Sequence, residues 1–257
     1  MGVKEFKKKD QKDYMKSEYA KMWTQMRNKE YQYDYYDKFL INLIRKTLKK
    51  SKKKKKILDV CCGDGNPFAK KLISKYDYFG IDISNHLIKI AKKNYGKDNF
   101  KTADVEKLNI REKFDLIICF HSLWYLPSYL NTIKNLSKFL KPNGYLIFDS
   151  LNKNNSANIK DFQKIVYETK GYGKFIRFLK NITKIIFKPG YTKWSDVIHH
   201  RLNDIQKINN IICNKKIFKE TTFFGLIENK KKLLKIKYQK NKRIDDFNKI
   251  IFKCKKL

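Results

Sequence analysis

Short, mostly apolar runs alternate in the first part of the chain with segments whose apolar positions recur at helical spacing. The runs, which are typical of strands covered on both faces, lie at about 57–60, 78–83, 114–120 and 145–148. The segments between them have the spacing of helices with one inward face and lie at 66–75, 85–95 and 130–140. This alternation predicts an α/β fold with a mostly parallel sheet.

The first apolar run leads into a glycine turn and then into a predicted helix. Gly63 and Gly65 permit a positive φ and a close approach of the backbone to a ligand. Pro67 suits the first turn of a helix, whose N–H groups then point at whatever occupies the turn. These features predict a small-molecule site. A dinucleotide fingerprint, G-x-G-x-x-G, would need glycine at 61, 63 and 66, and only position 63 has it, so a nicotinamide cofactor is disfavoured.

The spacing D-x-x-x-G-x-G, from Asp59 to Gly65, resembles motif I of the class I S-adenosylmethionine-dependent methyltransferases. Cys61 departs from the usual form of that motif, which has glycine there. The resemblance implies that this turn holds the amino-acid end of S-adenosylmethionine, with Asp59, Cys61, Gly63 and Gly65 among the cofactor-binding residues.

An acid follows the second predicted strand. Asp82 lies nineteen residues beyond Gly63, the separation at which a nucleotide-binding βαβ unit places a carboxylate on the ribose hydroxyls. An acid that only helps to cap the next helix is the alternative. The resemblance implies that Asp82 binds the ribose, with Ile83 beside it in the cofactor site. It also implies that Asp104 and Val105, after the third strand, contact the adenine.

The stretch Phe114–Pro127 joins an apolar run to a short loop and resembles motif IV of the same family. Open α/β sheets bind ligands at the carboxyl ends of their strands, where this stretch has its polar residues. The resemblance places Cys119 and Phe120 against the cofactor, and His121 and Tyr125, as candidate catalytic residues, on the acceptor side. His121 is the candidate general base because an imidazole titrates near neutral pH, and a structural role is the alternative.

The turn Lys141–Gly144 resembles the turn that precedes strand five in this family. The four matches occur in the family's order over residues 57–149. Together they predict a Rossmann-like, mostly parallel seven-stranded sheet with helices on both faces and an antiparallel last strand. The last two strands are expected at 217–224 and 247–254.

Three regions are expected along the chain: a frayed basic tail at 1–16, an N-terminal helical cap at 17–50, and a methyltransferase domain at 51–257. The second helix of the cap is expected at about 34–49. A helical lid is predicted at about 151–191, where residues 174–188 have the pattern of a basic amphipathic helix. A helix that only covers the sheet and a weak peripheral membrane contact are alternatives for that segment.

The net charge of +35 points toward nucleic acid, but only six of the 60 basic residues are arginine. Arginine makes the bidentate contacts typical of nucleic-acid recognition, whereas a lysine excess also arises from coding bias, so a nucleic-acid partner is not favoured. The five cysteines include no C-x-x-C pair, which disfavours disulfides and a metal site and favours a cytoplasmic protein. No apolar run has the length of a membrane span or the form of a signal peptide.

The sequence therefore predicts an S-adenosylmethionine-dependent methyltransferase acting on a small molecule or on a glycan sugar. An RNA methyltransferase, acting on tRNA or rRNA, is the alternative. A non-catalytic binding protein that retains the fold is a further rival, and the presence of Gly63, Gly65 and Asp82 counts against it. The sequence leaves the acceptor atom and the oligomeric state open.

Overall fold

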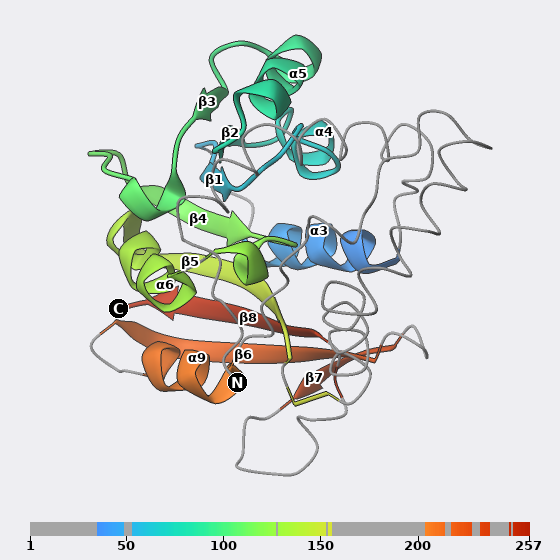
Figure 1. Ribbon diagram of the computed structural model, residues 1–257, viewed down its shortest axis with the longest axis vertical. Helices are drawn as coiled ribbons and strands as arrows, with labels where there is room; N and C mark the ends of the chain where they lie inside the picture. The colour runs from blue at the N-terminus through green and yellow to red at the C-terminus, as the bar shows by residue number, and fades with distance from the viewer. Residues whose placement is uncertain are drawn as a thin grey trace, which may run out of the picture.

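The computed structural model describes residues 35–48, 53–126, 128–152, 154–155, 204–213, 217–227, 232–236, 247 and 249–257. Over these ranges the chain forms one eight-stranded sheet with the order β3-β2-β1-β4-β5-β8-β6-β7 (Figure 1). The strands are β1 (Lys56–Val60), β2 (Asp77–Asp82), β3 (Phe100–Thr102), β4 (Phe114–Cys119), β5 (Leu140–Leu151), β6 (Phe218–Ile227), β7 (Lys232–Ile236) and β8 (Lys249–Lys256). The helices are α3 (Tyr35–Thr47), α4 (Phe68–Leu72), α5 (Asn85–Tyr95), α6 (Tyr129–Lys138) and α9 (Ile205–Ile212), with 3-10 turns η1 (Val105–Lys107) and η2 (Leu123–Tyr125).

Strands β1 to β5 all run in the same direction. The last strand, β8, is antiparallel to both of its neighbours, β5 and β6. The predicted mostly parallel sheet with an antiparallel last strand is therefore confirmed.

The predicted number of seven strands is wrong, because β7 adds an eighth strand at the edge beside β6. This strand lies in a lysine-rich segment between the last two predicted strands, where charged residues conceal the strand pattern. An edge strand tolerates lysine because one of its sides has no strand partner, and charge there discourages pairing with other chains. Leu234 of β7 is accordingly 36% exposed.

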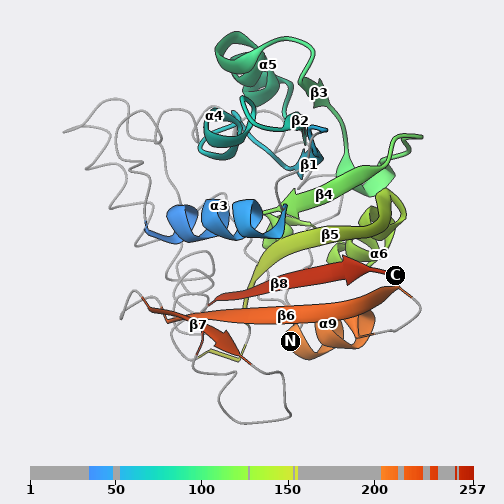
Figure 2. The same cartoon turned by 180° about the vertical axis from the view of Figure 1, so that it is seen from behind.

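Helices cover both faces of the sheet, as predicted (Figure 1, and from behind in Figure 2). Helices α3, α4 and α5 share one apolar core with the sheet, and α6 and α9 share the other. Neighbouring residues of β1 serve opposite cores, since Ile57 packs in the first and Leu58 in the second. The central strands are therefore buried on both faces, which is why their sequences are mostly apolar.

The helix predicted at 66–75 is shorter than expected, since α4 spans only Phe68–Leu72. Before it, the side chain of Asp64 accepts a hydrogen bond from the Asn66 N–H at 3.0 Å, which favours a turn over a helix. After it, the Lys75 N–H bonds to the carbonyl oxygen of Leu72 at 3.0 Å in a tighter turn.

The turn predicted at 141–144 lies inside β5, as an irregularity opposite β4. Asn143 has a φ of 61°, in the left-handed region. A Cβ at Gly144 would lie 2.9 Å from the carbonyl oxygen of Lys141, so the backbone passes too close for a side chain. These residues turn the chain locally, and the strand then resumes its pairing.

The predicted tail at 1–16 and the amphipathic segment at 174–188 lie outside the described residues. The described part of the cap, at 35–48, is the expected second helix, α3. The described part of the predicted lid is limited to 151–152 and 154–155. The domain boundaries therefore stay predictions.

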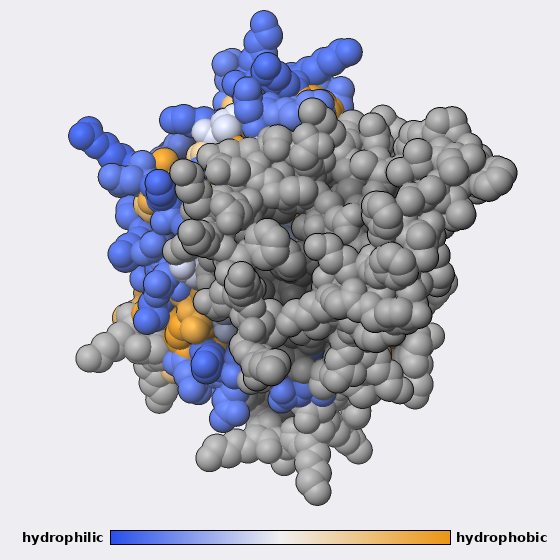
Figure 3. Space-filling view, viewed as in Figure 1, coloured by the Kyte–Doolittle hydropathy of each residue, from blue (hydrophilic) through white to orange (hydrophobic). Residues whose placement is uncertain are grey.

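The described surface on the side shown in Figure 3 is largely hydrophilic, with small apolar patches. This distribution agrees with a lysine excess spread over solvated positions. Among the described helices, none is both long and apolar enough to cross a membrane.

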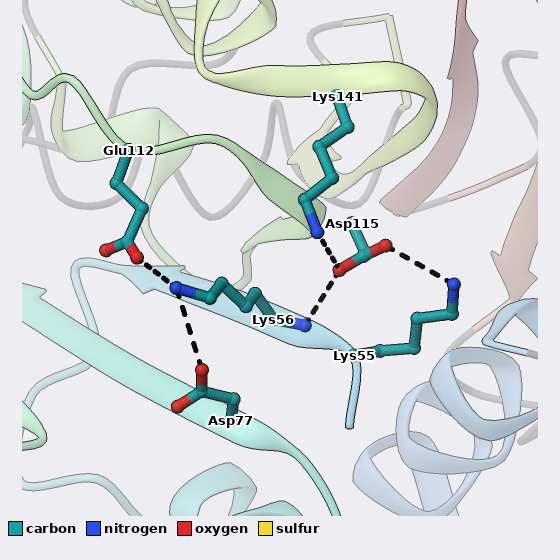
Figure 4. Close-up of polar contacts among 6 residues, drawn as sticks. All are labelled: Lys55, Lys56, Asp77, Glu112, Asp115 and Lys141. Carbon is teal, nitrogen blue, oxygen red and sulfur yellow. Dashed lines mark hydrogen bonds and ion pairs between the residues drawn. The ribbon is translucent and has the colours of Figure 1, made fainter. Parts of the chain in front are cut away.

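An ion network centred on Asp115 joins the starts of β1 and β4 to β5 (Figure 4). Its carboxylate accepts hydrogen bonds from the backbone N–H of Lys56, at 2.9 Å, and from the ammonium group of Lys141, at 2.7 Å. The ammonium group of Lys55 is 3.4 Å away, and that of Lys56 pairs with Glu112. Burial acts to raise the pKa of the Asp115 carboxyl, but the hydrogen bonds outweigh it and hold that pKa below its ordinary 3.8.

The substitution Asp115→Asn is expected to lower the free energy of unfolding at pH 7 by about 1–3 kcal/mol, because two donors lose a charged acceptor. Folding lowers the pKa of this carboxyl, so its contribution is present above the unfolded-state pKa and is lost as the pH falls through the folded-state pKa. Urea unfolding should therefore show a difference in the free energy of unfolding between wild type and Asp115→Asn that is larger at pH 7 than below about pH 3. The exposed Glu112→Gln control should have little effect. An equal loss at both pH values would contradict the ionic origin.

Candidate active site

The turn after β1 contains three residues with left-handed backbone. Their φ angles are 58° at Cys61, 58° at Gly63 and 84° at Gly65. Residues other than glycine rarely adopt this conformation, which explains why the motif that this turn resembles has glycine at the position of Cys61. A Cβ at Gly65 would lie 3.0 Å from the ring of Tyr95 and 3.1 Å from Ala69 Cβ, so glycine is required for packing as well.

Cys61 and Cys119 come from two separate motifs, and the pairing of β1 with β4 brings them together. A hydrogen bond with Cys119, together with burial, raises the pKa of the Cys61 thiol well above its ordinary 9.0. A protonated thiol is a poor nucleophile. The Cys61 thiol is therefore not activated as a nucleophile, and contact of Cys61 and Cys119 with the cofactor stays a prediction.

Asp82 fixes the glycine turn to the end of β2. One carboxylate oxygen accepts the Gly63 N–H at 2.9 Å, and the other accepts the Ser84 N–H at 2.8 Å. Burial raises the pKa of Asp82, and these two hydrogen bonds oppose the rise. The N-cap of α5 is Ser84 and not Asp82, since the Ser84 hydroxyl accepts the Leu87 N–H at 3.3 Å. Ile83, between Asp82 and Ser84, is half-buried.

Asp59 lies beneath the turn and is 3% exposed. Its carboxylate accepts a hydrogen bond from the hydroxyl of Tyr78 on β2. Burial raises the pKa of Asp59 from 3.8 to about 7, although the Tyr78 hydrogen bond opposes the rise. Asp59 thus connects β1 to β2, and its direct contact with a cofactor stays a prediction.

Asp104 begins η1, where its carboxylate accepts the Glu106 N–H at 3.0 Å, and the neighbouring Val105 is buried. A cavity of about 620 Å³ lies beside β2 and β3, and Asp104 is part of its lining. Its apolar lining comprises Leu58, Phe79, Ile81, Phe100, Ala103, Leu108, Ile110 and Phe114. The predicted adenine acid therefore borders an apolar cavity of ligand size, whereas Gly63 and Asp82 do not line it.

Phe120, directly after β4, packs on Phe68 at the start of α4, with ring centroids 5.1 Å apart. Phe120 is 4% exposed, so it belongs to the core at the end of β4, and its contact with the cofactor stays a prediction. Tyr125 lies further on, in η2, and is half-buried. Its place on the acceptor side stays a prediction.

His121 also has left-handed backbone, with a φ of 56°. Its backbone N–H donates to one carboxylate oxygen of Asp149 at 2.8 Å, and the hydroxyl of Tyr36 donates to the other at 2.8 Å. The imidazole lies between two acids, with Nε2 3.1 Å from Asp37 Oδ1 and Nδ1 3.9 Å from Asp149 Oδ2. The His121 side chain is 32% exposed, whereas those of Asp37 and Asp149 are 1% and 0% exposed.

His121 is predicted from the sequence as a site residue, whereas Asp37, Tyr36 and Asp149 are not. The sequence contains features that could have indicated two of them. Asp37 occupies the inward face of a predicted helix, three residues before Leu40, where an acid needs a partner. Asp149 ends the apolar run of the fifth strand, at the edge where open sheets bind ligands.

The substitution Asp59→Asn is expected to flatten the pH dependence of stability. Folding raises the pKa of Asp59, so its contribution is complete below the unfolded-state pKa and is lost as the pH rises through about 7. Thermal or urea unfolding should therefore show that the free energy of unfolding of wild type falls by about 2 kcal/mol more than that of the variant between pH 5.5 and pH 8.5. The exposed Asp77→Asn change, at the other end of β2, should retain the wild-type slope. Parallel pH profiles for wild type and Asp59→Asn would contradict this assignment.

Comparison with known proteins identifies relatives of this chain. Residues 30–184 match the methyltransferase domain family. The chain is similar to the ubiquinone biosynthesis O-methyltransferase of Coxiella burnetii, with 29% identity over 171 residues, covering 61% of this chain and 68% of that protein. It is also similar to malonyl-[acyl-carrier protein] O-methyltransferase 2 of Ilyobacter polytropus, with 27% identity over 136 residues, covering 51% and 52% of the two chains.

Solved structures share the fold at low sequence identity. A methyltransferase of Thermotoga maritima, described as a possible histamine N-methyltransferase, has a TM-score of 0.59 at 13% identity, covering 96% of this chain and all of that one. The magnesium protoporphyrin IX methyltransferase of Synechocystis PCC 6803, solved with bound S-adenosylmethionine, has a TM-score of 0.59 at 13% identity, covering both chains fully. The family match spans more than half of the 257 residues, and it confirms the resemblance seen in the motifs. The chain belongs to the methyltransferase domain family, and its fold is that of the class I S-adenosylmethionine-dependent methyltransferases.

Proposed function

We propose that this enzyme transfers the methyl group of S-adenosylmethionine to a small molecule, and that the carboxyl ends of β1, β2 and β4 hold the cofactor. The observation that carries the proposal is the carboxylate of Asp82, fixed at the glycine turn by the Gly63 N–H at 2.9 Å. A turn and an acid in this relation suit a nucleoside that carries a polar tail.

The residues present fit such a cofactor. The Asp82 carboxylate accepts backbone hydrogen bonds from Gly63, Ile83 and Ser84, which leaves capacity among its roughly four lone-pair sites for a ribose hydroxyl. The left-handed turn at Cys61, Gly63 and Gly65 lets the backbone approach the amino-acid end closely. Asp104 follows β3, whose last residue pairs with Asp82 at the end of β2, so the predicted adenine acid and the ribose acid lie at neighbouring strand ends.

When bound, S-adenosylmethionine supplies a methyl group that is already activated by the positive sulfur. The task of the chain is then to hold the acceptor in line with that methyl group and to exclude water. Phe120 and Phe68, both buried, pack together at the end of β4 and connect the start of α4 to that strand end. His121 and Tyr125 are the residues proposed to face the acceptor.

A small-molecule acceptor, including a sugar, is favoured over RNA. Of the relatives named above, one is an O-methyltransferase of ubiquinone biosynthesis and one is a malonyl-[acyl-carrier protein] O-methyltransferase. The solved structure from Synechocystis is a magnesium protoporphyrin IX methyltransferase, and none of these three names refers to RNA. The scarcity of arginine points the same way.

Isothermal titration with S-adenosylhomocysteine, the product form of the cofactor, tests the proposal. Wild type should bind, and Asp82→Ala should weaken binding by about 10–100-fold, because hydrogen bonds from the ribose hydroxyls to a charged acceptor are lost. Asp82→Asn, which keeps one acceptor oxygen, should weaken it less.

The matched control is Asp77→Asn, at the other end of β2, which should bind like wild type. Circular dichroism establishes that each variant is folded. A folded wild-type protein that does not bind S-adenosylhomocysteine would end the proposal.

A further inference from the structure

We propose that Asp37, Asp149 and Tyr36 are positioning residues that hold His121 as the proton acceptor for methyl transfer to a hydroxyl group. The proposal rests on the proposed function above and adds to it the class of acceptor. It also assigns the helix α3 a place in the active site, because two of the three positioning residues lie on that helix.

Asp149 holds the backbone of His121. Cys119 pairs with Phe148 across β4 and β5, so Asp149 lies beside the point where β4 ends. From there its carboxylate accepts the His121 N–H at 2.8 Å. A left-handed histidine is an unfavourable conformation that persists only where the surroundings hold it. The Asp149 hydrogen bond is such a support.

Asp37 fixes the imidazole ring of His121 through its Nε2 atom. Asp37 is buried on α3, and its carboxylate oxygen lies 3.1 Å from His121 Nε2. An ionised carboxylate can only accept a hydrogen bond, so Nε2 must carry the proton in this contact. The neutral ring then has its lone pair on Nδ1, and this is the tautomer that can take a proton from an acceptor at Nδ1. Nδ1 is 3.9 Å from Asp149 Oδ2, which is longer than a hydrogen bond.

Charged side chains from three elements lie near the imidazole ring of His121. Among the described residues, the charged groups around the ring are Asp37 on α3, Asp149 on β5 and Lys249 on β8. Lys249 lies over the ring of Tyr36, with its nitrogen 5.1 Å from the centroid, and Tyr36 packs edge-on against the imidazole at 5.4 Å. Two carboxylates therefore lie beside the ring on which a proton transfer would place a positive charge.

The arrangement suits a hydroxyl acceptor. As the hydroxyl oxygen attacks, its O–H bond breaks and an N–H bond forms at His121 Nδ1. The electron pair of the oxygen forms the bond to the methyl carbon, and the pair of the broken carbon–sulfur bond stays on sulfur. The proton later passes to water, since a third of the imidazole side chain is exposed. A neutral amine attacks with its own lone pair and needs no base for that step, so a built proton acceptor points to oxygen.

Nuclear magnetic resonance of the full-length, ¹⁵N-labelled protein tests the tautomer without any ligand. Long-range ¹H–¹⁵N spectra are recorded at about pH 9, where an ordinary imidazole is neutral. The His121 signals are assigned by their loss in His121→Gln, and the exposed His86 serves as internal reference. Wild type should show His121 protonated at Nε2 alone.

Two variants sharpen this test. Asp37→Ala should give a mixture of tautomers like that of free histidine, because the acceptor is removed. Asp37→Asn retains an acceptor oxygen and should retain the Nε2 tautomer. A wild-type proton on Nδ1, or a single Nε2 tautomer that persists in Asp37→Ala, would overturn the role of Asp37. The wild-type spectrum decides the first point even if a variant fails to fold.

Transfer of labelled methyl groups from S-adenosylmethionine tests the acceptor class, with catechol as the hydroxyl probe and benzylamine as the amine probe. We expect the rate of catechol methylation to fall by about 100-fold or more in His121→Gln and by about 10-fold in Asp37→Asn. Both variants should bind S-adenosylhomocysteine within about twofold of wild type.

Methylation of benzylamine instead of catechol, transfer to neither probe by a protein that binds S-adenosylhomocysteine, or unchanged rates in His121→Gln would overturn the hydroxyl assignment. Failure of the proposed function itself is distinguishable, because it would appear as a loss of S-adenosylhomocysteine binding by wild type.

Discussion

The parallel pairing of β1, β2, β4 and β5 is the constraint on which the site depends. Parallel strands end at the same edge of a sheet, so the residues that follow them meet there although they are far apart in the chain. Asp82 reaches the turn at Gly63, Cys61 meets Cys119, and Asp149 reaches His121. Asp115 and its lysine partners hold the opposite end of β1 and β4, so the same register is secured at both ends.

Left-handed backbone marks the two places where a strand gives way to the site. Cys61 follows β1 and His121 follows β4, and neither is glycine. Such residues are costly by about 1–3 kcal/mol each, so they persist where neighbouring groups restrain them. Cys61 is restrained by Cys119, and His121 by Asp149. The departure from the glycine motif at Cys61 therefore preserves the shape of the turn while adding a side chain to it.

Buried carboxylates give the site its polarity. Each has a donor: Tyr78 for Asp59, Gly63 and Ser84 for Asp82, and His121 with Tyr36 for Asp149. A buried acid without donors would be costly, so these contacts hold strands, turn and helix in one arrangement. The helix α3 thereby does more than cover the sheet, because Tyr36 and Asp37 connect it to the end of β4.

Residue type and spacing along the chain were enough to predict the parallel sheet, the glycine turn, the acid at Asp82 and His121, because these features are local patterns of residues. They did not reveal β7, whose lysines conceal its pattern, or the shortness of α4, which side-chain hydrogen bonds in the preceding turn impose. They also did not reveal the surroundings of His121. Asp37 and Asp149 lie 84 and 28 residues from it, and such distant pairs become neighbours only through strand register and helix packing.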